Sequence, residues 1–200
     1  MLSPMFKHAM ESFEHGLEHY LDGTERSRKF ALLHIDQAVE LLAKEKVIRL
    51  GKSIYKSNGT TLNLHEAFRS LKGLRIPEQP RLEELHDLRN AVQHKGLTPD
   101  SESTDFYVHV AYGFIKRFLA EELETPIDQV ISRQYRALVE GRSLPQVAEA
   151  LTVLENARSA SSPSERIITG YTALSQIVEC LAEAGSERVS FRGPLRRAAA

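Results

Sequence analysis

Apolar residues recur at helical spacing along most of the chain, and an alternating β pattern is almost absent. Five apolar residues of the first segment follow a 4-3-4-3 spacing: Phe6, Met10, Phe13, Leu17 and Tyr20. This spacing places them on one face of a helix. The same periodicity predicts helices over residues 30–50, 64–71, 81–95 and 105–123, and one that Pro126 opens towards Gly141. Six helices in about 140 residues predict an all-α fold, an antiparallel helical bundle.

Short polar segments separate the predicted helices. The hydroxyl of Thr24 can cap the long second helix. Pro99-Asp100 precedes the helix that we expect from Asp105. A short β-hairpin near Ile54 and Thr61 is the strongest alternative to helix, and it would lie at the periphery of the bundle.

The chain divides into a helical domain of residues 1–140 and a C-terminal helical segment of residues 141–200. We expect two helices in this segment, over residues 144–157 and 164–184. The second contains QIVECLA, which matches QAVELLA of residues 37–43 at five of seven positions. Two interpretations stay open: the segment begins a second, incomplete repeat of the domain, or two amphipathic helices agree by chance.

The overall charge provides no field that would recruit nucleic acid. The formal net charge is −1 and the pI is about 6.7, so an acidic partner would need a local basic patch. Residues 26–56 hold eight basic side chains against three acidic ones: Arg26, Arg28, Lys29, Lys44, Lys46, Arg49, Lys52 and Lys56, against Asp36, Glu40 and Glu45. A solvated helix face balanced by acids elsewhere is the favoured interpretation, and a nucleic-acid patch is the alternative.

The composition is that of a soluble globular chain, with 42% hydrophobic and 26% charged residues. Cys180 is the only cysteine, so no intrachain disulfide can form and a reducing compartment is expected. The N-terminus lacks the apolar core of a signal peptide. No run approaches the roughly 20 apolar residues of a membrane span. These features predict a cytoplasmic protein without a membrane partner.

The segment LRNAVQHKG, residues 88–96, lies at the end of the helix predicted over 81–95. The apolar stripe of this helix comprises Leu82, Leu85, Leu88 and Val92, and its polar stripe comprises Glu83, Asp87, Asn90 and His94. Arg89 projects about 140° away from His94 around an ideal helix. The two can act together if the last turn before Gly96 unwinds, if the arginine curls around the helix, or if a second protomer brings its own His94 opposite. Periodicity alone predicts a solvated polar stripe.

The residues from Arg89 to His94 read RNAVQH, an arginine and a histidine separated by four residues. With this signature the chain resembles the HEPN superfamily. HEPN proteins are small all-α domains found in ribonuclease toxins, antiviral defence systems and RNA-processing factors. The resemblance covers roughly residues 5–123: a long helix, a loop, a short helix, the motif helix and an aromatic-rich helix follow in the family's order. The place of the motif, late on the fourth helix, makes the match more specific than the two letters alone.

The resemblance implies metal-independent endoribonuclease chemistry without a cofactor. In such a site the 2′-hydroxyl of RNA attacks the phosphate, and His94 takes or donates a proton near neutrality. Arg89 stays charged and stabilises the phosphate, while Asn90 orients His94 or the phosphate. A homodimer is also implied, because one histidine cannot easily be both acid and base in a single step. RNA, an antitoxin or a larger defence complex are the partners that the family suggests.

Two features bear on the activity that this resemblance implies. Gly96 stands where HEPN toxins that pair with nucleotidyltransferase antitoxins typically carry a tyrosine, so an antitoxin that modifies such a tyrosine is not expected. The alternative to an enzyme is a non-catalytic HEPN module for RNA binding, dimerisation or partner recruitment. The intact Arg89–His94 motif favours the enzyme, and the modest overall charge favours the module.

Other histidines receive weaker assignments. His15 and His19 have the i, i+4 spacing that can bind zinc, but no third ligand has an obvious placement, so a solvated face is favoured and no metal site is assigned. His34 is expected to be a buried structural histidine. Glu40 either assists the Arg89 site or is solvated. No role is assigned to two further histidines, His86 and His109, and Cys180 is expected in the core.

Overall fold

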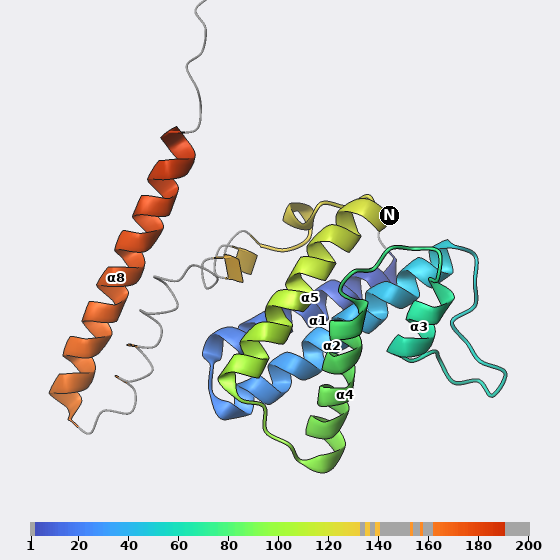
Figure 1. Cartoon of the computed structure of the whole chain (residues 1–200), viewed down its shortest axis with the longest axis horizontal. Coiled ribbons are helices and arrows are strands. Elements are labelled where there is room, and N and C mark those ends of the chain that lie inside the picture. The colour runs from blue at the N-terminus through green and yellow to red at the C-terminus, as the bar shows by residue number, and fades with distance from the viewer. Residues whose placement is uncertain are drawn as a thin grey trace, which may run out of the picture. The chain divides into compact units, whose positions relative to one another are not determined.

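The computed structural model describes residues 3–132, 135–136, 139–140, 153, 157 and 162–190, with the backbone alone for 176–177 and 179–190. The chain forms two compact units, Met1–Tyr135 and Arg136–Ala200 (Figure 1). The first unit holds α1 (Pro4–Asp22), α2 (Glu25–Arg49), α3 (Leu64–Ser70), α4 (Gln79–Lys95), α5 (Ser101–Glu122) and the short 3-10 helix η1 (Ile127–Gln129). The second unit holds α8 (Pro163–Ser190). The described elements are helical, which confirms the predicted all-α class.

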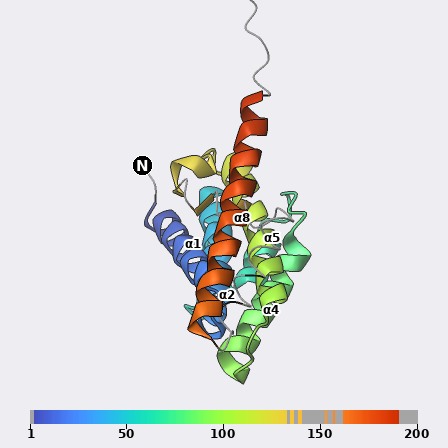
Figure 2. The same ribbon diagram turned by 90° about the vertical axis from the view of Figure 1, so that its left-hand side faces the viewer.

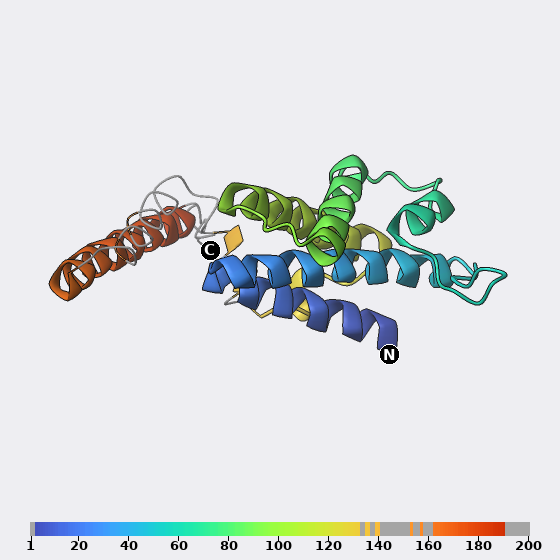
Figure 3. The same ribbon diagram turned by 90° about the horizontal axis from the view of Figure 1, so that it is seen from below.

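Helix α2 is the central element of the first unit. It packs against α1, α3, α4 and α5, and Figures 2 and 3 show α1 on one side of α2 and α4 on the other. Contact with neighbours on several sides buries apolar side chains along the whole helix: Ala31, Leu32, Ile35, Ala38, Val39, Leu42, Ala43 and Val47. The charged residues Asp36, Lys44 and Glu45 are buried with them. A buried charge is costly without a partner, so α2 requires polar neighbours inside the unit.

Helices α1 and α2 form a hairpin whose boundaries follow from its sequence. The five residues predicted for the apolar stripe of α1 are all buried, which confirms that prediction. Gly23 ends α1 with a φ of 67°, a left-handed conformation that favours glycine. The Thr24 hydroxyl accepts a hydrogen bond from the Ser27 amide at 3.2 Å, as the predicted cap. This cap starts α2 at Glu25, before the expected residue 30.

The two helices approach closely at Gly16. A Cβ atom at this position would lie 2.5 Å from Ile35 Cγ1 and 3.3 Å from the Ala31 carbonyl oxygen. We therefore expect Gly16→Ala to lower the free energy of unfolding by about 1–3 kcal/mol, the usual cost of overpacking. Gly113→Ala is the matched control, because no atom lies within 4 Å of its Cβ position on α5. The control should leave stability unchanged or raise it by up to about 1 kcal/mol, and urea denaturation measures both; equal effects would contradict the close packing.

Other helix starts also differ from the prediction. Helix α5 begins at Ser101 rather than at Asp105, because the Asp100 carboxylate accepts a hydrogen bond from the Ser103 amide at 2.6 Å and caps an earlier turn. The helix expected to open at Pro126 is replaced at its start by η1, a 3-10 turn of three residues.

The hairpin alternative is realised in a minimal form. Tyr55 and Thr61 form one isolated antiparallel bridge, and the Leu62 amide donates to the Ile54 carbonyl oxygen at 2.8 Å. The bridge lies in the loop between α2 and α3, outside the helical core (Figure 1). The predicted peripheral position is therefore confirmed.

The second unit is described mainly by α8. This helix covers the predicted segment 164–184 and extends it to Ser190. The helix predicted over 144–157 lies outside the described residues except for 153 and 157, and so does the side chain of Cys180. Within the part of the chain that the structure describes, no helix has the length and apolar character needed to cross a membrane.

Candidate functional site

Helix α4 presents the three predicted site residues on a regular helix. Arg89 and Asn90 are partly exposed and His94 is exposed. The helix continues to Lys95 and is capped by Gly96, whose φ of 68° favours glycine; this gives a structural reason why tyrosine is not found there. Because the helix remains intact through Lys95, unwinding of the last turn does not bring Arg89 and His94 together.

Arg89 is held against α2. Its Nε donates to the Asp36 carboxylate at 2.6 Å, and one terminal nitrogen lies 3.8 Å from Glu40 Oε2. The other terminal nitrogen donates to Asn90 Oδ1 at 3.0 Å and to Gln93 Oε1 at 3.3 Å. The guanidinium is therefore fixed between two helices, and 20% of the side chain remains exposed.

Asp36 is the buried anchor of this arrangement. Its side chain is fully buried and accepts hydrogen bonds from Arg89 and from His86, whose Nδ1 lies 3.1 Å from both carboxylate oxygens. Withdrawing such a charge from water costs several kcal/mol before its partners offset the loss. The α2–α4 contact thus contains a charged network whose burial costs desolvation free energy. Apolar residues would pack the two helices together without that cost.

Glu40 extends the network by one turn of α2. Its carboxylate accepts from Lys44 Nζ at 2.6 Å, and the same ammonium group donates to Thr61 Oγ1 at 3.2 Å. Lys44 is buried, and Glu40 is its ion-pair partner. Of the two roles open for Glu40, the structure supports the one in which it neighbours Arg89.

His94 differs from Arg89 in its surroundings. Among the residues that the structure describes, no hydrogen bond or ion pair engages its imidazole. Asn90 lies one turn before His94 and is bonded to Arg89, so the amide is the polar side chain between the two. The structure brings Arg89 and Asn90 together, and it does not bring His94 into polar contact with either of them.

His86 is a site residue that sequence reasoning missed. It was assigned no role, yet it is buried and contacts Asp36, and its ring lies edge-on to that of His65 at 5.3 Å. The signal was present on α2 rather than on α4: Asp36 stands among apolar positions next to Ile35. A carboxylate on a buried face requires cationic or donor partners, and the helical wheel of α4 places His86 beside the apolar Leu82 and Leu85.

The pKa of His86 is raised above its ordinary value of 6.5, chiefly by the hydrogen bond to Asp36. A histidine with a raised folded-state pKa stabilises the fold below pH 6.5, and this contribution is lost as the pH rises through the raised value. We expect the stability difference between the wild-type protein and His86→Gln to shrink as the pH rises from 6.5 through the raised pKa of His86. His34 affects stability in the opposite direction, because burial lowers its pKa. Since His34 is present in both the wild-type protein and His86→Gln, the difference between these two proteins isolates the effect of His86. Urea denaturation across pH measures it; a pH-independent difference would contradict the assignment.

The basic run of residues 26–56 is largely neutralised. Five of its eight cations form ion pairs: Lys29–Glu25, Lys44–Glu40, Lys46–Glu122, Arg49–Glu45 and Lys56–Glu66. Arg28 donates to the carbonyl oxygens of Pro99 and Gly23, and Lys52 donates to that of Ser70. These contacts favour the interpretation of a balanced helix face over that of a nucleic-acid patch.

Asp36, Glu40 and His86 also satisfy the spacing of a metal site, since one ligand atom of each lies within 4.8 Å of the others. The carboxylates already bind cations of the protein, Arg89 at 2.6 Å and Lys44 at 2.6 Å. Charge neutralisation from within the chain accounts for the cluster. We therefore assign it as an ion-pair network.

His34 is not the buried structural histidine that the sequence predicts. Its side chain is half-buried and faces α1, where its ring centroid lies 4.8 Å from that of His15 and 5.7 Å from that of His19. The prediction was wrong because a single helix does not reveal the neighbour across the hairpin.

Comparison with known proteins adds no relative. No family model matches the chain, and no curated protein or solved structure matches it. The function is therefore argued from the residues themselves.

Proposed function

We propose that the chain is a metal-independent endoribonuclease of the HEPN type, with its site at the end of α4. The observation that carries the proposal is the fixed position of Arg89: a fully buried carboxylate, Asp36, holds its Nε at 2.6 Å while part of the guanidinium stays exposed. A buried ion pair contributes little net stability over apolar packing. The presence of the Asp36–Arg89 pair is explained if the guanidinium has to be held in this position to bind a ligand.

The roles follow from the chemistry of each side chain. Arg89 keeps its charge and offers donors to a phosphate that gains charge during cleavage. His94 is exposed and makes no hydrogen bond or ion pair with the described residues, so its imidazole can exchange a proton with the 2′-hydroxyl or with the leaving group. Asn90 is bonded to Arg89 and lies one turn before His94, which suits a role in orienting either group.

A homodimer is part of the proposal. Cleavage needs one group to take a proton and another to give one, and each chain supplies one His94 at this site. A two-fold axis near the end of α4 would pair two such histidines in one groove. Leu97 follows His94 closely in sequence and is 42% exposed, an apolar contact that an isologous interface would cover.

The test is cleavage of single-stranded RNA by the purified full chain in EDTA, beside DNA of the same sequence. Cleavage of the RNA alone, with loss of the cut when the 2′-hydroxyl is replaced by hydrogen, is expected if that hydroxyl is the nucleophile. No RNA cleavage at protein concentrations where the chain is dimeric would refute the enzyme.

One set of observations favours a second candidate, the non-catalytic HEPN module for RNA binding, dimerisation or partner recruitment. Arg89 is bonded inward, and the basic run on α2 is paired. A module of this kind would dimerise without cleaving RNA. Equilibrium sedimentation beside the cleavage assay distinguishes the two candidates.

The biological setting belongs to the same proposal. The HEPN resemblance suggests a role within bacterial defence or a toxin system, and the single cysteine suits a cytoplasmic location. Its partners there would be RNA, an antitoxin or a larger defence complex.

A further inference from the structure

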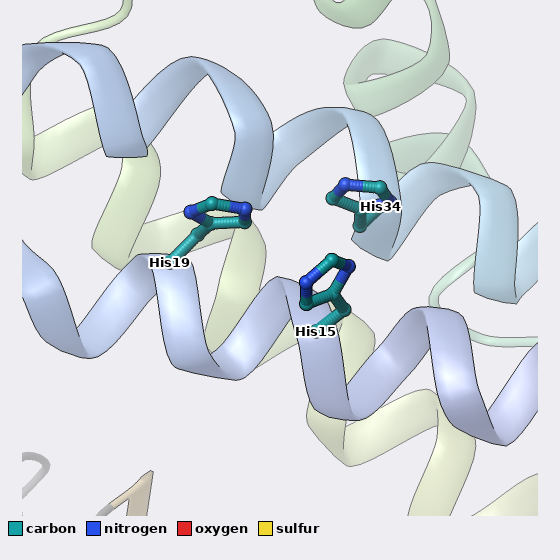
Figure 4. A group of neighbouring side chains, drawn as sticks. All are labelled: His15, His19 and His34. Atoms are coloured by element: carbon teal, nitrogen blue, oxygen red, sulfur yellow. The ribbon is translucent and has the colours of Figure 1, made fainter.

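We infer that His15, His19 and His34 form a Zn²⁺ site that joins α1 to α2. One ring nitrogen from each of the three lies within 4.8 Å of the others. Figure 4 shows the three rings gathered between the two helices, two from α1 and one from α2. This site shares no residue with the Arg89 network, and it goes beyond the proposed ribonuclease.

The spacing of the nitrogen atoms is close to that of a tetrahedral metal site. Zn–N bonds of about 2.0–2.1 Å place two ligand nitrogens about 3.4 Å apart. The ligand nitrogens now lie within 4.8 Å of one another. To bind the ion, two of them would therefore have to approach each other by little more than about 1 Å. His15 is exposed and His19 partly so, so rotation of their side chains can supply this movement without repacking the core.

The protein provides little else to engage these imidazoles. Among the described residues, His19 and His34 have ring contacts but no hydrogen bond or ion pair. The rings of His19 and His34 are stacked, with an angle of 4° between their planes. Neutral imidazole is the form that binds metal.

A carboxylate lies behind one of the ligands. Glu18 Oε2 is 3.9 Å from His15 Nε2, and the Tyr135 hydroxyl donates to Glu18 Oε1 at 2.6 Å. Metal-binding histidines commonly direct their second nitrogen at such a carboxylate, which fixes the orientation of the ring. Glu18 lies close enough to His15 to orient its ring in this way when the ion binds.

The donor set indicates the metal. Three imidazoles suit Zn²⁺, Cu²⁺ or Ni²⁺ rather than Mg²⁺ or Ca²⁺, which prefer oxygen. We assign Zn²⁺, with water in the fourth position, because three nitrogen ligands and one open position are a common tetrahedral arrangement for this ion. Binding would fasten the two helices of the hairpin and stabilise the first unit, since an ion that binds the folded state shifts the equilibrium towards it.

The experiment uses the full chain, purified without a histidine tag and freed of metal. Titration calorimetry with ZnCl₂ should show one ion per chain, and Co²⁺ should give the visible absorption of a tetrahedral complex. A zinc excess should raise Tm. His34→Ala and His15→Ala should each weaken binding by about tenfold or more, whereas His8→Ala, an exposed histidine of α1 outside the cluster, should bind as the wild type does.

The variants guard against misfolding as an explanation. His15 is exposed, so its replacement should leave the far-UV circular dichroism of the metal-free protein unchanged. The inference is overturned if the wild type binds no zinc, or if His34→Ala and His15→Ala bind it as tightly as the wild type. It is overturned equally if His8→Ala weakens binding as much as they do. None of these outcomes depends on whether the protein cleaves RNA.

Discussion

The His94→Ala variant is expected to cleave RNA about 10²- to 10⁴-fold more slowly than the wild-type protein, the usual contribution of a general acid or base. Its stability should not change, because His94 is exposed and the described residues make no polar contact with its imidazole. Initial rates on a labelled RNA in EDTA, together with thermal melting curves, measure both effects. Loss of activity at unchanged Tm identifies a chemical role, since the fold is then intact.

The control for this variant is His8→Ala, which removes an exposed imidazole from α1 and should leave the cleavage rate unchanged. Arg89→Lys complements it by keeping the positive charge while removing the planar fork, which should slow cleavage if the fork binds phosphate. If His94→Ala cleaves RNA as fast as the wild type does, the catalytic assignment is wrong, and a contaminating ribonuclease is the simplest source of the activity.

The second large effect is expected at Asp36. Asp36→Ala should lower the free energy of unfolding by about 3–5 kcal/mol, because it removes the buried acceptor of the Arg89 guanidinium and the His86 imidazole. The matched control is Glu84→Ala, which breaks the exposed i, i+3 ion pair with Arg81 on α4 and should cost less than about 1 kcal/mol. Urea denaturation of the two variants gives the comparison. Equal costs would show that the Asp36 network does not hold α2 to α4.

A combined variant separates stability from function at this network. Asp36→Leu with His86→Leu and Arg89→Met replaces the buried carboxylate and both of its partners by apolar side chains, which often preserves or raises stability. A stable protein without ribonuclease activity is expected if the pair is retained to position the arginine. Full activity in this variant would contradict the role of Arg89.

Much of the fold could be predicted because single helices reveal their own buried faces. The stripe of α1 follows from its spacing, and Thr24 follows from the preference of hydroxyl side chains for helix caps. The start of α5 was misplaced because Asp100 and Ser103 can both begin a helix, and the sequence does not show which one accepts the amide hydrogen bond. The short η1 after Pro126 depends on packing that periodicity does not report.

The candidate site was predictable in part, for a related reason. The motif of α4 could be located in the sequence, but its partners lie on α2, about 50 residues away, as the 3.1 Å contact between His86 and Asp36 illustrates. His34 shows the same limit, since its role depends on the face of α1 that it meets. Partners across a helix pair become visible only when the rotation of both helices is fixed.

Gly16 has a consequence beyond packing. It follows His15 in the chain and faces Ile35, which follows His34. The close approach of the two helices at Gly16 therefore sets the distance between the imidazoles of His15 and His34. A larger residue there would separate the helices and the histidines together. Over evolution, the glycine and the three histidines should therefore be inherited or lost as one unit, which gives distant relatives of this chain a signature independent of the α4 motif.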